Sequence, residues 1–256
     1  MSFENPRVFQ GKGVTTWEGL IKSVRAKVKG TKVKIRLGAS SGEWKAMVAD
    51  EAARTTFAKN IKTVLEKNKL DGIDLDFEWA ENEKEYKDYS LAILKMREVL
   101  GDKYLFSVSL HPVCYKISKE AIEAVDFISL QCYGPSPVRF PIEKYCSDIQ
   151  MVLEYGIPKE KLVAGVPFYG VTKDNSKKTE AYFNFVQNGL VTSPAQNEVI
   201  YQGDTYVFDG QDNIRIKTRY AKEQKLKGMM SWDLATDLPL SDSRSLLKTM
   251  TEELRE

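Results

Sequence analysis

The sequence of 256 residues contains a single histidine, His111, and only three cysteines, Cys114, Cys132 and Cys146. Three is an odd number and no two of the cysteines form a Cys-x-x-Cys pair, so they predict neither a disulfide framework nor a zinc site. A single histidine argues against a Ser-His-Asp hydrolase. The sequence also lacks a Walker motif and a Gly-x-Gly-x-x-Gly motif, which leaves nucleotide chemistry without support.

An excess of charge of one sign is lacking as well. The 38 Lys and Arg residues nearly balance the 36 Asp and Glu residues, for a net charge of +2, so nothing predicts a nucleic acid or an anionic membrane as partner. No apolar run approaches the roughly 20 residues that a membrane-spanning helix needs. The N-terminus shows no signal-peptide pattern, which indicates either a cytoplasmic protein or a chain from which an export segment has been removed.

What the sequence does contain is an acidic stretch in which large apolar residues alternate with carboxylates from Ile73 to Glu78. Successive side chains of a strand point to opposite faces, so Asp74, Asp76 and Glu78 are predicted to share one face. Burying three carboxylates side by side is costly, because desolvation and like charges both oppose ionisation. Helical patterns on both sides argue against a solvated antiparallel edge, so we interpret the carboxylates as functional.

Six strand patterns alternate with helical patterns along the chain. Alternation of this kind predicts a parallel sheet with helices outside it, either open or closed as a barrel, and a length of about 250 residues suits one domain over residues 1–256. The predicted strands span residues 32–38, 73–78, 104–110, 125–133, 161–168 and 228–233.

The pattern changes between about residues 171 and 216. A short helix is predicted at 181–186, and short strands are predicted at 199–201, 205–208 and 214–216, separated by glycine-containing turns. We therefore predict a small β-rich insertion on the loop after the fifth strand.

Unusual side chains lie at the carboxyl ends of the predicted strands, which is where barrels of this type carry their functional groups. These residues are Glu78, His111, Tyr133, Tyr169 and Trp232.

The acidic stretch resembles the Asp-x-x-Asp-x-Asp-x-Glu signature of glycoside hydrolase family 18, the chitinases and endo-β-N-acetylglucosaminidases. Asp71, Asp74, Asp76 and Glu78 complete the signature, and Gly72 follows its first Asp. Further segments resemble later strands of the family in the same order, and the resemblance spans about residues 16–250. It implies a (β/α)8 TIM barrel. The further segments are Gln131–Tyr133, Gly165–Gly170 and Gly228–Trp232.

The chain departs from the family pattern at three places. Gly134 stands where the family often has Asp after the tyrosine, and residues 36–39 read Arg-Leu-Gly-Ala where the family usually has Ser-x-Gly-Gly. The acidic strand is the fourth in the family but the second here. We therefore expect either an incomplete barrel or, preferably, a shortened version of a longer chain.

Position on the strand suggests separate roles for the carboxylates. Glu78 is last on the strand and should reach furthest into a cleft, so we assign it as the acid that protonates the glycosidic oxygen and later as the base for water. Asp76 lies one pleat below it. Asp74 lies another pleat down and is expected to exchange a proton with Asp76, whereas Asp71 is off the period and is expected to be structural.

The resemblance implies that the 2-acetamido group of the sugar acts as the nucleophile and that the anomeric configuration is retained. In this scheme Asp76 orients the acetamido N–H, Tyr133 donates its hydroxyl to the acetamido carbonyl, and Trp232 forms an apolar floor beneath the sugar. Trp232 could equally be a core residue, Tyr169 could equally pack in the core or at the rim, and Trp79 could merely cap a helix. Gln131 is the remaining residue that is expected to bind substrate.

The expected partner is a glycan that contains N-acetylglucosamine, and chitin, N-glycan cores and peptidoglycan all remain open. No cofactor is expected, and the sequence predicts no oligomeric state. Two other classes remain as alternatives: a non-hydrolytic carbohydrate-binding relative, and a metal enzyme that uses the carboxylates to bind Mg²⁺ or Ca²⁺. The family favours a secreted, periplasmic or cell-surface location if an export signal has been removed.

Overall fold

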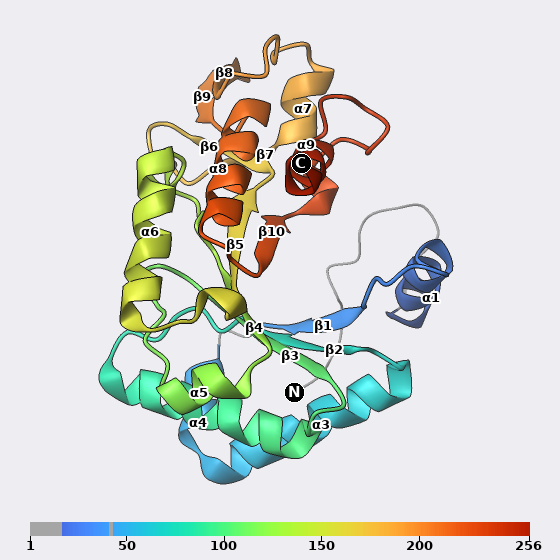
Figure 1. Cartoon of the computed structure of the whole chain (residues 1–256), viewed down its shortest axis with the longest axis vertical. Coiled ribbons are helices and arrows are strands. Elements are labelled where there is room, and N and C mark those ends of the chain that lie inside the picture. The colour runs from blue at the N-terminus through green and yellow to red at the C-terminus, as the bar shows by residue number, and fades with distance from the viewer. Residues whose placement is uncertain (1–16, 41–42) are drawn as a thin grey trace.

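The computed structural model describes residues 17–40 and 43–256. Its main sheet has six parallel strands that lie side by side in chain order and curl into half of a barrel (Figure 1). This arrangement confirms the predicted fold, a barrel-type α/β protein with six βα units. The strands are β1 (Arg36–Ala39), β2 (Gly72–Leu75), β3 (Leu105–Leu110), β4 (Phe127–Leu130), β5 (Leu162–Pro167) and β10 (Gly228–Trp232).

Helices cover the outer face of the curled sheet, with α3, α4 and α5 below β2 to β4 and with α6 and α8 beside β5 and β10 (Figure 1). Asp50 caps α3 and Ser118 caps α5, because each side chain accepts a hydrogen bond from the first turn of its helix. The helices are α1 (Trp17–Lys27), α2 (Trp44–Ala49), α3 (Glu51–Asn68), α4 (Glu83–Leu100), α5 (Lys119–Ala124), α6 (Ile142–Tyr155), α8 (Gln211–Glu223) and α9 (Leu246–Arg255), with short 3-10 helices at Pro137–Arg139, Lys159–Lys161 and Leu234–Thr236.

The two faces of the acidic stretch are separated as the alternation predicts. Ile73, Leu75 and Phe77 are at most 2% exposed, and the Phe77 ring stacks on Trp44 from α2 at 5.4 Å. The opposite face carries the carboxylates toward the concave side of the sheet. Burial of the apolar face against α2, α3 and α4 therefore determines which way the carboxylates point.

Two strands end earlier than predicted. Regular pairing stops at Leu75 in β2 and at Leu130 in β4, although the next residues stay bonded to the neighbouring strand. Asp76 N donates to Ala39 O at 2.9 Å, and Gln131 N donates to Leu110 O at 2.7 Å. The strand ends thus leave the sheet as extended segments that carry polar side chains over its carboxyl edge.

The predicted insertion forms a second, antiparallel sheet with the strand order β7-β6-β9-β8. Its elements are β6 (Tyr169–Thr172), β7 (Thr179–Ala181), α7 (Tyr182–Gln187), β8 (Glu198–Tyr201) and β9 (Asp204–Val207).

One part of the insertion was predicted wrongly. The expected strand at 214–216 lies inside helix α8, which begins at Gln211. Ile214, Thr218 and Ala221 are buried while Ile216 is 46% exposed, which is the spacing of a helix face. The alternation Ile-Arg-Ile imitated a strand because it is too short to separate the two periods. The segment Thr15-Thr16-Trp17-Glu18 predicts a capping box, with Thr15 and Glu18 three positions apart, but Thr15 lies outside the described residues.

Candidate active site

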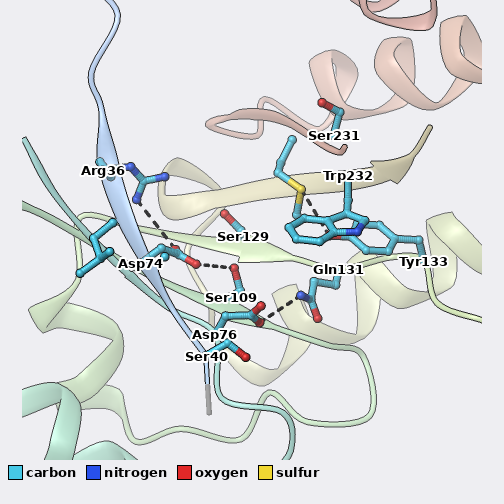
Figure 2. A pocket seen from close by; sticks show the side chains of 13 residues that line it. Arg36, Ser40, Asp74, Asp76, Ser109, Ser129, Gln131, Tyr133, Ser231 and Trp232 are labelled. Carbon is cyan, nitrogen blue, oxygen red and sulfur yellow. Dashed lines mark hydrogen bonds and ion pairs between the residues drawn. The ribbon is translucent and has the colours of Figure 1, made fainter. Parts of the chain in front are cut away.

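The carboxyl ends of β2, β4, β5 and β10 surround a cleft made of two adjoining cavities of about 360 and 340 Å³. Both cavities are lined by Asp76, Gln131, Tyr133 and Trp232, four residues that the sequence places more than 150 positions apart at the extremes. The parallel register brings them together at one edge of the sheet, as expected for this architecture. Figure 2 shows the first cavity with these side chains around it.

Gln131 connects the two upper carboxylates of the acidic stretch. Its Nε2 donates to Asp76 Oδ1 at 3.1 Å and approaches Glu78 Oε1 at 3.3 Å. Glu78 is exposed at the cleft, whereas Asp76 is half-buried below it. One amide thus holds both carboxyl groups in a common orientation.

Asp76 has an unusual affinity for protons. Burial is the main cause that raises its pKa to about 7, the negative charges of Glu78 and Asp74 raise it further, and the hydrogen bond from Gln131 acts in the opposite direction. A carboxyl group with this pKa is partly protonated near neutral pH and can both accept and donate a hydrogen bond there.

Asp74 lies deeper in the cleft and is surrounded by donors. Its Oδ2 accepts from Ser109 Oγ at 2.7 Å, its Oδ1 accepts from Ser107 Oγ, and the Arg36 guanidinium lies 3.8 Å from Oδ1 (Figure 2). Asp71 accepts instead from Ile35 N at 2.8 Å. This contact, between the segments that lead into β1 and β2, agrees with the expected structural role of Asp71.

Two tyrosines that follow the carboxyl ends of β4 and β5 form one wall of the cleft. Tyr133 is 6% exposed, its hydroxyl donates to Met230 Sδ at 3.5 Å, and its ring meets Tyr169 edge-on at 6.4 Å. Burial holds the pKa of Tyr133 well above its usual value, so its hydroxyl keeps the proton and remains a donor. Tyr169 donates its own hydroxyl to Gly134 O at 3.3 Å.

Trp232 is 53% exposed, so it is not a core residue. Its indole follows the end of β10 and lines both cavities (Figure 2). An exposed tryptophan beside polar groups is the kind of surface on which the apolar face of a sugar ring packs.

Peptide bonds 78–79 and 232–233 are both cis.

Trp79 packs on His111 with ring centroids 4.7 Å apart, and both residues line the second cavity. Within the described residues the indole Nε1 of Trp79 is buried without a hydrogen-bond partner. His111 Nδ1 accepts from Val113 N at 3.2 Å, which leaves Nε2 to donate to Tyr133 O at 3.0 Å. Burial lowers the pKa of His111 to about 4, so the ring is neutral near pH 7.

Some residues that line the first cavity were not among the predicted site residues. They include Arg36 of β1 and two serines of β3 and β4, Ser109 and Ser129. Period-two polar residues in otherwise apolar strands were the signal that could have found them. Those that line the cavity are Arg36, Ser109 and Ser129, and Ser107 lies between Arg36 and Asp74.

Among the described residues, no group of three or more His, Cys, Asp or Glu side chains is arranged to hold a metal ion. In the same part of the chain, no helix combines the length and the apolar character needed to cross a membrane.

Comparisons with known sequences agree with the geometry. The sequence model of the family described as "Glycosyl hydrolases family 18" matches residues 5–237. The protein named "Probable chitinase 2" from Drosophila melanogaster is 23% identical over 273 aligned residues, which cover 80% of this chain and 56% of the relative. The chain therefore spans about half the length of this curated relative.

Solved structures show the same fold. A chitinase from Bacteroides thetaiotaomicron matches with a TM-score of 0.80 and 22% identity, covering 91% of this chain and 80% of that one. The chitinase-like agglutinin RobpsCRA from Robinia pseudoacacia matches with a TM-score of 0.77 and 18% identity, covering 92% and 84%. At such low identity a shared fold carries no statement about activity.

Proposed function

Because the chain belongs to glycoside hydrolase family 18, we propose that it hydrolyses β-1,4 linkages of glycans that contain N-acetylglucosamine, such as chitin or chito-oligosaccharides. The observation that carries this proposal is the pair of carboxyl groups of Asp76 and Glu78, joined by Gln131 at the floor of an open cleft. We take residues 1–256 as one catalytic domain with the antiparallel sheet as an insertion.

Glu78 is the proposed general acid. It is the uppermost carboxylate of the stretch and is exposed to the cleft, so it is the one that a bound glycan would reach. Glu78 protonates the glycosidic oxygen, and the protonated oxygen is a better leaving group. The Glu78 carboxylate that results then takes a proton from the attacking water. Both steps need only one carboxyl group, which changes role between them.

The proposed nucleophile is the 2-acetamido oxygen of the substrate itself. Glycoside hydrolase family 18 uses this group in place of a second carboxylate of the enzyme. Asp76 would accept the acetamido N–H and stabilise the charge that develops on the ring formed with C1. Tyr133 would donate its hydroxyl to the acetamido oxygen in place of its weak contact with Met230. Retention of configuration follows, and a substrate without the N-acetyl group should not react.

The sugar that is cleaved would pack on Trp232, whose exposed indole lies across the cleft from Asp76 (Figure 2). Tyr169 and Gln131 would complete the wall of this subsite, and Trp79 would line the neighbouring one in the second cavity. The proposed substrate is therefore a polymer or oligomer that spans both cavities, and the reaction uses no cofactor.

A chromogenic glycoside of N-acetylchitobiose tests the proposal. We expect the wild type to release the chromophore and Glu78→Gln to lower kcat by about 10²–10⁴-fold, because the amide N–H is far too weak an acid to protonate the leaving oxygen. Glu81→Gln is the matched control: its carboxylate is three residues away and exposed, where it pairs with Lys45 at 3.0 Å. Equal activity of wild type and Glu78→Gln would contradict the proposal.

A second candidate function is carbohydrate binding without hydrolysis, for which the exposed indole of Trp232 at the cleft would suffice. A wild type and a Glu78→Gln variant that are equally inert, yet both bind chito-oligosaccharide in calorimetry, would support it. N-glycan cores and peptidoglycan remain alternative substrates, which product analysis separates. Loss of activity in EDTA would instead support a metal enzyme.

A further inference from the structure

Arg36 is an unusual residue for the position that it occupies. It begins β1 and lines the first cavity, where its guanidinium group points toward Asp74 (Figure 2). Its side chain is 26% exposed, and its guanidinium carbon lies 4.6 Å from the centre of the Phe127 ring. A cation is thus held inside the half-barrel by an aromatic face on one side and by polar groups on the other.

The polar side of Arg36 is a short hydrogen-bonded chain that ends on Asp74. Arg36 Nη1 donates to Ser107 Oγ, and Ser107 Oγ donates to Asp74 Oδ1. Ser109 Oγ donates to the other oxygen, Asp74 Oδ2, at 2.7 Å. Both oxygens of Asp74 therefore act as acceptors, and the guanidinium 3.8 Å from Oδ1 balances the negative charge.

We propose that Arg36 is a positioning residue of the acidic face: with Ser107 it holds Asp74 as a fixed hydrogen-bond acceptor of balanced charge, so that Asp74 takes no part in the proton transfers of glycoside cleavage. This inference rests on the proposed function, and it replaces the exchange of a proton between Asp74 and Asp76 that the sequence predicts. Glu78 gives its proton to the leaving oxygen, and no proton passes through Arg36.

The electrostatic consequence falls on Asp76. This carboxyl interacts with Asp74 and Glu78 on its own stretch, with Tyr133 after β4 and with Tyr89 of α4, whereas Arg36 on β1 acts on Asp74. Asp126, which is paired with Arg97, also acts on Arg36. The charge of Asp74 is one of the causes that raise the pKa of Asp76 to about 7. Removing Arg36 leaves that charge unbalanced, so the pKa of Asp76 should rise further.

Carboxyl NMR of protein labelled at the aspartate Cγ measures this effect directly, with Asp76→Asn used to assign the signal. In Arg36→Met we expect the midpoint of Asp76 to rise by about one pH unit. Arg36→Lys keeps the charge and should stay close to the wild type. Lys34→Met is the matched control: it removes one positive charge from the same segment, but beside Asp71, from which Lys34 lies 3.5 Å away, and it should leave Asp76 unchanged.

If Arg36→Met does not fold, Ser107→Ala gives the same test, because it removes only the hydroxyl between Arg36 and Asp74 and should shift Asp76 in the same direction by a smaller amount. An unchanged midpoint in the variant that folds would overturn the inference, as would an equal shift in Lys34→Met. These outcomes do not depend on turnover. A wild type without any glycosidase activity would refute the proposed function and leave the NMR result to decide the role of Arg36.

Kinetics adds a readout that a merely structural role would not move. In Arg36→Met, kcat should fall by about ten- to a hundredfold with little change in KM, and the limb of the pH–rate profile that follows Asp76 should move upward with the NMR midpoint. Arg36→Lys should restore both. A variant that is only less stable, with the wild-type pH profile, would show that Arg36 serves packing and not the acidic face.

Discussion

At the scale of single residues, the acidic face places three carboxyl groups side by side, and their negative charges repel one another. Asp76 lies half-buried between two other carboxylates, and its pKa is raised to about 7 from an ordinary value of 3.8. A carboxyl group with a higher pKa in the folded state than in the unfolded state stabilises the protein at low pH. That stabilisation is lost as the pH rises through the folded-state pKa. The site is therefore maintained at the expense of stability near and above neutral pH.

The raised pKa of Asp76 predicts how Asp76→Asn changes the free energy of unfolding. The variant should match the wild type near pH 4, where Asp76 is protonated in the folded state, and should be more stable above pH 7, where the wild type carries the unfavourable charge. One pKa unit corresponds to about 1.4 kcal/mol, and solvent in the open cleft reduces a shift of this size to a gain of about 1–2 kcal/mol.

Urea unfolding at pH 4.5, 6 and 8 measures the difference, with Asp102→Asn at an exposed carboxylate as control. A variant less stable than the wild type at pH 8 would show that the hydrogen bond from Gln131 outweighs the cost of burying the charge.

At the scale of elements, helix α3 holds the acidic stretch from outside. Phe57, Ile61 and Leu65 lie on one buried stripe of the helix, and Phe57 packs on the Phe77 ring of the stretch at 5.9 Å. The helix begins where the Asp50 side chain accepts a hydrogen bond from Ala53 N at 2.7 Å. The cap thus fixes the first turn of the element that supports the carboxylates.

Asp50→Ala should lower the free energy of unfolding by about 1 kcal/mol, because the N–H groups of the first turn lose their acceptor. Asp50→Asn is the matched control and should change little, since asparagine caps a helix as well as aspartate does. Denaturant midpoints at constant slope give the two values. A loss in Asp50→Asn as large as that in Asp50→Ala would attribute the effect to charge and not to capping.

At the scale of the whole molecule, one buried ion pair joins the insertion to the half-barrel. Asp209, just after β9, accepts from Lys217 Nζ of α8 at 2.6 Å, and the two side chains are 0% and 1% exposed. Phe140 and Tyr145, at the start of α6, place their rings 5.9 and 5.4 Å from the ammonium group. Burial raises the pKa of Asp209 above its usual value even beside Lys217, so the carboxylate depends on its partner to stay ionised.

Lys217→Met should destabilise the protein by about 3–5 kcal/mol at pH 7, because it leaves an unpaired carboxylate in the core. The loss should shrink as the pH falls, since the raised pKa lets Asp209 take up a proton in the folded state. The double variant Lys217→Met, Asp209→Leu removes both charges and should recover most of the stability. Thermal unfolding of the three proteins measures this, and a double variant no more stable than the single one would contradict the argument.

Much of the architecture and part of the site could be predicted from the chain itself. The apolar periodicity predicts helices over residues 83–100 and 142–155, which are the bounds of α4 and α6, and the alternation from Ile73 to Glu78 assigns the two faces correctly. The error at Ile214–Ile216 arose because three residues do not distinguish a strand from a helix. Sequence periodicity predicts an element correctly where several helical turns or strand pleats repeat. It fails where a segment is too short to distinguish the strand period of two from the helix period of 3.6.

The sequence by itself determined that this is a barrel-type α/β protein of glycoside hydrolase family 18 with its carboxylates on one face, because those features are encoded by residues close together in the chain. Only the tertiary structure decided that Gln131 joins Asp76 to Glu78, that Trp232 is exposed, and that Arg36 balances Asp74. Positions 36, 74 and 107 meet through the register and curl of three parallel strands. No local pattern carries that information, since it depends on how the whole sheet packs against its helices.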